Sequence, residues 1–393
     1  MKIVIAAAML LGAVTTIRVI DLAAQSPRLG EPLPGITAFE LEEFRLGLDD
    51  FLEVETSEEG LGPAFNGASC AVCHNVPVVG GAGVIGEIRA AGRDVNGRPV
   101  PLSRDGETLF QLFSIPLHGC QVQLPPEAVI IARRIPIPLF GAGLVEAIPD
   151  EAILARADPD DLDGDGISGR AAIVRDLATG NSRVGRFGWK AQHATLLVFG
   201  ADAYRNEMGI TNDLFREELG VGLTAAQHAR CDPLPDPEDR IDPATRRRGI
   251  DNFASFMRLL APAGRGESGP LVAEGQQVFT TVGCSSCHTP QLTTGPSRER
   301  AFDRQPVPLF SDLLLHDVGT GDEIPQAAAL PEEIRTPALW GLRFRRPLLH
   351  DGSAPTIADA IGRHGGEAEA ARRRFEAASP SAREALIAFL KSL

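Results

Sequence analysis

The sequence contains fewer basic than acidic side chains, 38 Lys and Arg against 52 Asp and Glu, and its formal net charge at pH 7 is −14. This net charge argues against nucleic acid as a partner, because its phosphates would repel the chain. The apolar run from Ile3 to Val14 is too short to cross a bilayer comfortably. A length of 393 residues, 44% of them hydrophobic, is sufficient for a soluble protein of two or three domains.

The N-terminus resembles an export signal. Lys2 supplies a positive charge before the apolar run, and Leu-Ala-Ala at 22–24 offers a cleavage site, although Arg18 and Asp21 make that site imperfect. We therefore expect residues 1–24 to be a signal peptide, the protein to be periplasmic, and the mature chain to have no transmembrane helix. An uncleaved membrane anchor is the alternative.

Cysteine is scarce, with six in the chain, and four of the six form two C-x-x-C-H motifs. Two thiols one helical turn apart can add to the vinyl groups of a porphyrin, and the following histidine can bind the iron. One copy could be a chance match or half a zinc site, but two copies in an exported chain predict two covalent haem c groups. The residues involved are Cys70, Cys73 and His74, and Cys284, Cys287 and His288.

The remaining two cysteines are Cys120 and Cys231. In an oxidising compartment a free thiol is a liability, so we expect these two to form a disulfide. Two unconnected buried thiols are the alternative.

Helical spacing of apolar residues recurs in three stretches. Each haem motif is followed by one such stretch, which predicts a mainly α-helical fold of two cytochrome c-like domains, at 36–263 and 264–393, with a loop-rich insertion at about 120–240. The first stretch, 40–53, is expected to cover the first haem. The stretches are 40–53 with Leu41, Phe44 and Phe51, 251–261 with Phe253, Phe256, Met257 and Leu260, and a C-terminal one with Leu386, Leu390 and Leu393 that starts at the capping box Ser381–Glu384.

An acidic loop lies inside the insertion. Asp161, Asp163 and Asp165 alternate with other residues and precede Gly166, which is how a loop wraps calcium with oxygen ligands. Ala172 stands where an EF-hand has its bidentate glutamate, so an EF-hand is excluded. Calcium bound with the help of a remote carboxylate is expected, and a metal-free acidic turn is the alternative.

Several segments resemble the bacterial di-haem cytochrome c peroxidases, and more closely their relatives in the di-haem oxidoreductase family, some of which are labelled thiol oxidoreductases. The resemblance implies a small oxidant such as hydrogen peroxide as substrate and a redox partner protein as electron donor. The segments are RTPALW at 335–340, LHDGS at 349–353, AIGRHGGE at 360–367, DLDGDGISGR at 161–170, RFGWK at 186–190 and DLLLHD at 312–317.

The same resemblance suggests the axial ligands of the C-terminal haem. In the peroxidases, the position fourteen residues beyond the histidine of His-Asp-Gly is a methionine ligand, and here that count leads from His350 to His364. We therefore expect His288 and His364 to bind this iron, and imidazole in place of a thioether to lower its reduction potential. His350 is expected to shape the loop, and His316 is the alternative ligand.

The N-terminal haem has His74 beneath it and no obvious distal ligand, so peroxide could react there. His118 and His193 are candidates for a distal ligand or proton carrier. Trp189 and Trp340 are candidates for electron transfer between the haems, although either could simply be core. The sequence predicts a peroxidase-like enzyme with a reactive N-terminal haem and an electron-relay C-terminal haem. An electron-transfer cytochrome with two six-coordinate irons and an oxidase of an organic or protein substrate are the alternatives.

Overall fold

The computed structural model describes residues 27–102, 106–115, 122–218, 223–232, 234–235 and 237–393. Helices account for 31% of the chain and strands for 13%. Helix therefore exceeds strand, as expected, but small sheets are present and more than half of the chain lies in turns and loops, so the expectation of a mainly helical fold is met only in part. Within the described residues, no helix combines the length and the apolar character that a membrane span requires.

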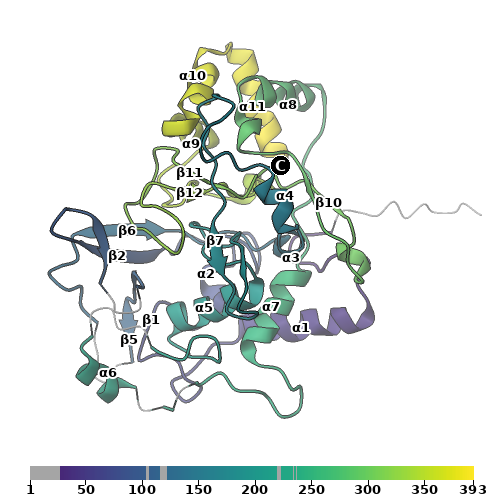
Figure 1. The fold of residues 1–393 in the computed structure, drawn as a ribbon. Coiled ribbons are helices and arrows are strands. Elements are labelled where there is room, and N and C mark those ends of the chain that lie inside the picture. Colours follow the sequence, from purple (N-terminus) through teal and green to yellow (C-terminus); the bar gives the residue numbers. More distant parts are fainter. Residues whose placement is uncertain (1–26, 103–105, 116–121, 219–222, 233, 236) are drawn as a thin grey trace, which may run out of the picture.

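Two groups of helices lie at opposite ends of the molecule (Figure 1). One contains α1, α5 and α7, and the other contains α8 to α11. The α-helices are α1 (Ala38–Leu52), α2 (Cys70–Cys73), α3 (Ala142–Glu146), α4 (Asp150–Leu154), α5 (Leu196–Met208), α6 (Ala225–Cys231), α7 (Gly249–Leu259), α8 (Pro270–Thr281), α9 (Ile357–Gly362), α10 (Glu369–Ala377) and α11 (Pro380–Ser392). Short 3₁₀ helices are η2 (Cys284–Ser286), η3 (Arg300–Phe302), η4 (Leu342–Phe344) and η5 (Gly366–Ala368).

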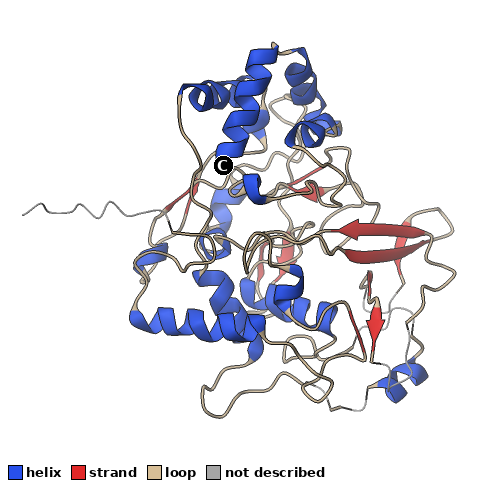
Figure 2. Ribbon diagram, turned by 180° about the vertical axis from the view of Figure 1, so that it is seen from behind, coloured by secondary structure: helices blue, strands red, loops and turns tan. Residues whose placement is uncertain are grey.

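The strands are short and lie mostly between these two groups and to one side of them (Figure 2). They are β1 (Ala64–Phe65), β2 (Glu87–Arg93), β3 (Pro99–Pro101), β4 (Leu109–Phe110), β5 (Phe113–Ser114), β6 (Ile130–Arg134), β7 (Ile173–Arg175), β8 (Ser182–Val184), β9 (Leu292–Thr293), β10 (Pro306–Val307), β11 (Leu315–His316) and β12 (Ile334–Arg335).

The first helix pair is formed by α1 and α7, which pack along each other. They approach closely at Gly47, where a Cβ atom would collide with the carbonyl oxygen of Asn252. Beside this crossing, the Phe256 ring lies 5.3 Å from Phe44 and 4.7 Å from Phe51 between ring centroids. The two stretches predicted from helical spacing therefore pack against each other through the apolar faces that the spacing indicated.

The second pair repeats this arrangement with α8 and α11. Its close approach is at Gly275, where a Cβ atom would collide with the carbonyl oxygen of Ala385. The rings of Phe279 and Phe389 pack beside it in a tilted arrangement, with their centroids 5.3 Å apart. Each C-x-x-C-H motif is thus accompanied by one pair of helices that cross at a glycine and bury phenylalanines.

The cap of α11 differs from the prediction. Ser379 is the N-cap, and its hydroxyl accepts a hydrogen bond from the backbone N–H of Ala382 at 3.2 Å. The predicted capping box of Ser381 and Glu384 is wrong, because the helix begins at Pro380 and both residues are already inside it. Proline suits the first helical position, where its missing N–H is not needed.

The largest sheet is built around β2, which pairs antiparallel with β3, β4 and β6. Its register places Glu87 opposite Arg134. This part of the chain has no clear periodicity in the sequence, since strands of two to seven residues give too few alternations to recognise.

The largest hydrophobic cluster contains residues from both sides of residue 264, including Phe253 and Leu309. A second cluster, which includes Phe279 and Phe389, belongs to the C-terminal helices. The domain boundary at residue 264 stays a prediction.

Cys231 is disulfide-bonded. Its predicted partner, Cys120, lies outside the described residues, as does the predicted signal peptide at 1–24.

Candidate haem sites

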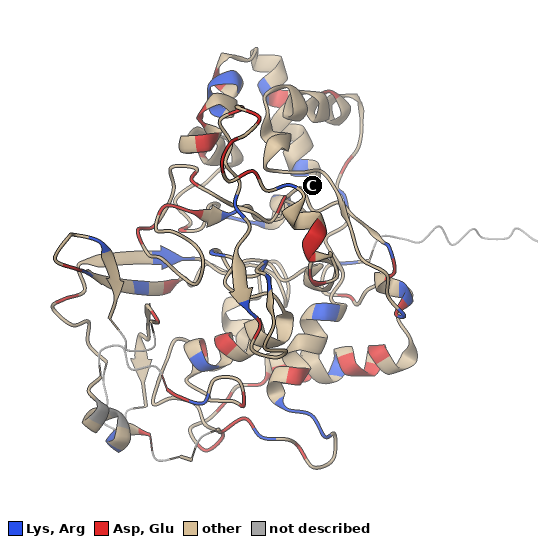
Figure 3. Cartoon of the chain, viewed as in Figure 1, with Lys and Arg blue, Asp and Glu red and all other residues tan. Residues whose placement is uncertain are grey.

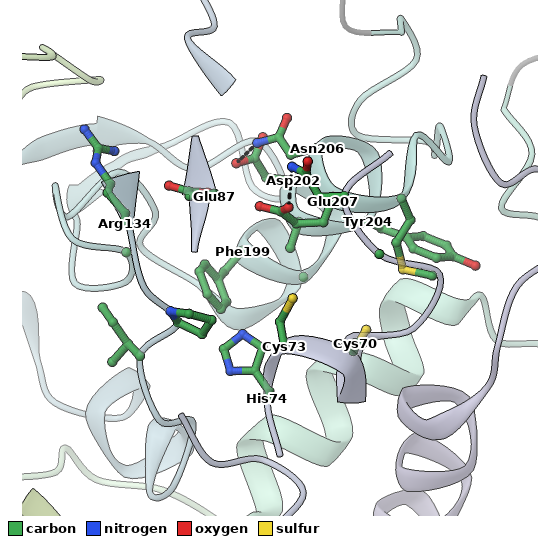
Figure 4. Close-up of a pocket in the computed structure, with 18 of the residues that line it drawn as sticks. Cys70, Cys73, His74, Glu87, Arg134, Phe199, Asp202, Tyr204, Asn206 and Glu207 are labelled. Atoms are coloured by element: carbon green, nitrogen blue, oxygen red, sulfur yellow. Dashed lines mark hydrogen bonds between the residues drawn. The ribbon is translucent and has the colours of Figure 1, made fainter. Parts of the chain in front are cut away.

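The first C-x-x-C-H motif lies in a cavity that we call the N-terminal pocket (Figure 4). Helices α2, α5 and α7 and strands β2 and β6 all contribute side chains to it. In the close-up, His74 lies across the pocket from the carboxyl groups of α5 and β2. The lining residues used below are Cys70, Cys73, His74, Glu87, Arg134, Trp189 and Glu207.

His74 is oriented by the backbone. Its Nδ1 lies 3.0 Å from the carbonyl oxygen of Gly81. A carbonyl can only accept, so Nδ1 carries the proton and Nε2 is unprotonated. Burial lowers the pKa of His74, which keeps the imidazole neutral. A neutral imidazole with an unprotonated Nε2 is what iron ligation requires.

The two thiols of this motif bracket the single turn of α2, which Ser69 caps by accepting from the backbone N–H of Ala71. Burial raises the pKa of both Cys70 and Cys73 to about 12. Zinc binds thiolates, and these buried thiols resist ionisation. Among the described residues neither belongs to a group of three potential metal ligands, whereas Cys287 of the second motif forms such a group with Asp312 and His316.

Two carboxyl groups meet opposite His74. Glu87 forms a paired ion contact with Arg89, at 2.9 and 3.0 Å, while Glu207 accepts from the amide of Asn66 at 2.8 Å. Burial raises the pKa of Glu207 to about 8, and the charge of Glu87 and its hydrogen bond with Glu207 add to this effect. Burial opposes ionisation of Glu87 too, but the adjacent Arg89 lowers its pKa. At neutral pH, Glu207 therefore holds a proton beside an ionised Glu87.

Sequence reasoning missed this carboxyl pair and proposed histidines in its place. His193 does not line the pocket. Its Nε2 bonds at 2.9 Å to Asp202, which does. His118 lies outside the described residues.

The second motif lies in another cavity, the C-terminal pocket, formed largely by η2, β12, α9 and the segment after η4. The lining residues used below are Cys284, Cys287, His288, Arg335, Arg345, His350 and His364, together with Trp189. As in the first motif, burial raises the pKa of Cys284 to about 12.

Two histidines in this pocket have the same hydrogen-bonding arrangement. The Nδ1 atom of His288 donates to the carbonyl of Phe310 at 3.0 Å, and that of His364 donates to the carbonyl of Ala360 at 2.7 Å. Each Nε2 lone pair is therefore free. Burial, followed by the nearby His364, lowers the pKa of His288 to about 4. The pocket thus contains two neutral imidazoles, each able to bind a metal.

His316, the alternative ligand, has no free nitrogen. Its Nε2 contacts Asp312 at 2.9 Å and its Nδ1 contacts Glu367 at 2.7 Å. Burial alone would lower the pKa of His316, but hydrogen bonds led by that to Asp312 raise it to about 12. A protonated imidazole between two carboxylates cannot bind iron, which disfavours this alternative.

The two tryptophans differ in position. Trp189 lines both pockets and donates from Nε1 to the carbonyl of Ile135 at 2.8 Å. The His350 ring packs edge-on against it at 6.2 Å. Trp340 lines neither pocket and belongs to the largest hydrophobic cluster. Trp189 is therefore the better candidate for a position between two haems.

In the acidic loop, the structure brings carboxylate oxygens of Asp158, Asp161 and Asp163 within 4.8 Å of one another. Asp165 is not in this group, although it was expected to be. It accepts from the backbone N–H of Ile167 at 2.9 Å, and both residues line the C-terminal pocket. The loop after α4 therefore reaches the edge of that pocket.

The family described as "Di-haem oxidoreductase, putative peroxidase" matches residues 116–393, more than half of the chain. No curated protein matches.

Three solved structures are similar to the chain. Hydrazine synthase of Kuenenia stuttgartiensis is 14% identical with a TM-score of 0.44, and all of both chains is covered. The diheme peroxidase BthA of Burkholderia thailandensis is 17% identical with a TM-score of 0.42, covering 94% of this chain and 89% of that one. A MauG-like protein associated with microbial copper homeostasis is 16% identical with a TM-score of 0.40, covering 95% and 94%.

The family match implies two haems, and the chain has two pockets, each with a C-x-x-C-H motif and a neutral histidine. The chain belongs to the di-haem oxidoreductase family of enzymes.

Proposed function

We propose that the chain is an exported, periplasmic peroxidase with two cytochrome c-like domains and two covalent haem c groups. Cys70 and Cys73 would anchor the N-terminal haem, and Cys284 and Cys287 the C-terminal one. Hydrogen peroxide is the proposed oxidant. Its reduction to two waters takes two electrons and two protons. The protein must bring the electrons through the haems and the protons through side chains of the pocket.

The proposal rests on one difference between the two pockets, the number of histidines that could bind a haem iron. Two imidazoles with free Nε2 atoms, His288 and His364, line the C-terminal pocket. Among the described residues, His74 is the only imidazole that lines the N-terminal pocket. Six-coordinate iron suits electron transfer, and an open coordination position suits reaction with a small oxidant.

Bound haem would supply the iron that stores electrons and accepts an oxygen ligand. The residues of the N-terminal pocket would hold and transfer the proton. Glu207 holds one within the pocket, and the ionised Glu87 beside it can accept or relay one. Trp189, which lines both pockets, offers an aromatic side chain between them for electron transfer.

An electron-transfer cytochrome remains the second candidate because of two thioethers. Met208 on α5 and Met257 on α7 both line the N-terminal pocket. If either sulfur also bound the iron held by His74, no position would be left for peroxide and the haem would serve electron transfer. Oxidation of an organic or protein substrate would need the same open position as peroxide reduction.

Spin-state spectroscopy separates these candidates. We expect one low-spin haem with two histidine ligands and one high-spin haem in the oxidised or half-reduced protein. His364→Ala should convert the low-spin signal to high spin, because it removes one ligand. His364→Met should leave it low-spin and raise its reduction potential, because a thioether favours ferrous iron.

Two results would contradict the assignment. Two low-spin haems that do not react with peroxide would favour the electron carrier. A redox titration in which His364→Met changes nothing, while His316→Ala produces a high-spin signal, would make His316 the ligand.

Electrons would come from a redox partner protein. Acidic residues are frequent on α1, which contacts α2 of the first motif (Figure 3). A donor with a basic patch fits this surface, and its on-rate should fall as ionic strength rises.

Calcium binding by the acidic loop remains a proposal. We expect calorimetric titration to detect one site, and Asp161→Asn to weaken it by about tenfold or more, because the charge and number of oxygen ligands set the affinity. Asp242→Asn is the matched control, since Asp242 also accepts backbone N–H groups in an exposed turn. Absence of calcium from the purified protein, together with a flat titration, would leave an acidic turn without metal.

A further inference from the structure

Two buried arginines lack a carboxylate partner. Six arginines among the described residues are more than nine-tenths buried, and four of these form ion pairs. Arg335 and Arg345 form none within the part of the chain that the structure describes. The four pairs are Arg89 with Glu87, Arg134 with Asp322, Arg186 with Asp150 and Arg205 with Asp202.

Arg345 has no side-chain hydrogen bond to any described residue, and its Nε atom is buried without a partner. The side chain is 4% exposed and lies over the Trp189 ring, 5.6 Å from the centroid. Burial lowers the pKa of Arg345 to about 10. Such a charge is costly in a protein interior unless an anion pairs with it.

Arg335 is held by the backbone alone. Its Nε donates to the carbonyl of Gly188 at 2.8 Å, and one terminal nitrogen donates to the carbonyl of Thr336 at 3.1 Å. Burial, followed by the charge of Arg345, lowers its pKa to about 10. The two guanidinium groups are therefore close enough to repel each other.

A third unpartnered group faces the same pocket. His350 is 5% exposed and its Nδ1 atom has no hydrogen-bond partner. Burial lowers the pKa of His350, so the neutral ring can donate one hydrogen bond. Arg335, Arg345 and His350 all line the C-terminal pocket, next to Trp189.

We propose that Arg335, Arg345 and His350 bind the two propionate carboxylates of the haem in the C-terminal pocket. This inference rests on the proposed function, which puts a haem there. Two carboxylates balance two guanidinium charges, and a planar guanidinium matches a carboxylate with paired hydrogen bonds. The carboxylates that line the pocket, Asp165 and Glu367, form no ion pair with these arginines, so the cofactor would supply their partners.

This assignment makes Arg335 and Arg345 positioning residues for the haem and gives them an effect on its reduction potential. A positive charge beside the propionates favours the reduced, less positive iron. Removing that charge leaves a propionate uncompensated and should lower the potential.

The test uses the full-length protein with both haems attached. Arg345→Gln should lower the potential of the low-spin haem in a spectroelectrochemical titration and shift the propionate bending bands in resonance Raman spectra. Arg346→Gln is the matched control, because it removes the same charge from an exposed neighbour. Arg345→Lys keeps the charge but not the paired geometry, so it should shift the bands while leaving the potential near that of the native protein.

Mass spectrometry of the native protein comes first. Absence of haem on Cys284 and Cys287 would overturn the proposed function itself. Haem present, with potential and Raman bands in Arg345→Gln that match those of Arg346→Gln, would overturn only the propionate assignment. If Arg345→Gln does not fold, unchanged propionate bands in Arg345→Lys overturn it as well.

Discussion

Replacing Cys284 and Cys287 together by serine should remove one of two covalent haems and lower the mass of the denatured protein by that of one haem. Thioether bonds to these two sulfurs are the only covalent link proposed for the C-terminal haem. The low-spin signal with two histidine ligands should be lost with it, because His288 and His364 face the same pocket. The corresponding Cys70 and Cys73 double variant should instead lose the high-spin signal.

Cys231→Ser is the control, since Cys231 is disulfide-bonded and lies outside both pockets. It should keep two haems. Two haems retained in either double variant would show that the motifs do not attach haem, and the pockets would then need another occupant.

Two kinds of feature could be predicted from the sequence: the haem-attachment motifs, through their chemistry, and the helices, through the spacing of their apolar residues. Attachment of haem at two thiols requires a fixed spacing, so Cys70 and Cys73 are recognisable in the sequence without knowledge of the fold. Helix spacing likewise depends on neighbours three and four residues away, which is why Phe253 and Phe256 on α7 indicated the face that packs on α1.

Contacts between distant segments could not be predicted. Glu87 begins a strand and Glu207 lies near the end of α5, and only the sheet and the helix together bring them into one pocket. Neither residue stands in a motif. Histidines were favoured because the ordinary pKa of imidazole suits proton transfer, whereas burial and a neighbouring carboxylate give Glu207 a suitable pKa instead.

Contacts made on folding also distinguish His316 from His364. Sequence spacing allowed either to bind the C-terminal iron. The structure distinguishes them by their partners: two carboxylates occupy both nitrogens of His316, whereas one backbone carbonyl occupies only the Nδ1 of His364. Asp312 and Ala360 each lie four residues from their histidine, but the contact of Glu367 with His316 joins two distant elements and is not visible in a linear sequence.

Glu207→Gln should slow peroxide reduction by about 10²- to 10⁴-fold while leaving both haems attached. Cleavage of the O–O bond requires a proton on the departing oxygen, and Glu207 is the carboxyl group of the N-terminal pocket that holds one at neutral pH. Glutamine keeps the size and can still accept from Asn66, but it cannot release a proton. Steady-state turnover with peroxide and a reduced donor measures the effect, with Glu274→Gln on the exposed face of α8 as control.

The pH dependence provides an independent test of the same role. Because burial and Glu87 raise the pKa of Glu207 to about 8, its proton is present below that pH and is lost above it. Activity of the native enzyme should therefore fall as pH rises through about 8, and this step should be absent from the residual activity of Glu207→Gln. A native rate and an unchanged pH profile in both Glu207→Gln and Glu87→Gln would mean that the proton has another source. His118, which lies outside the described residues, would then be the next residue to test.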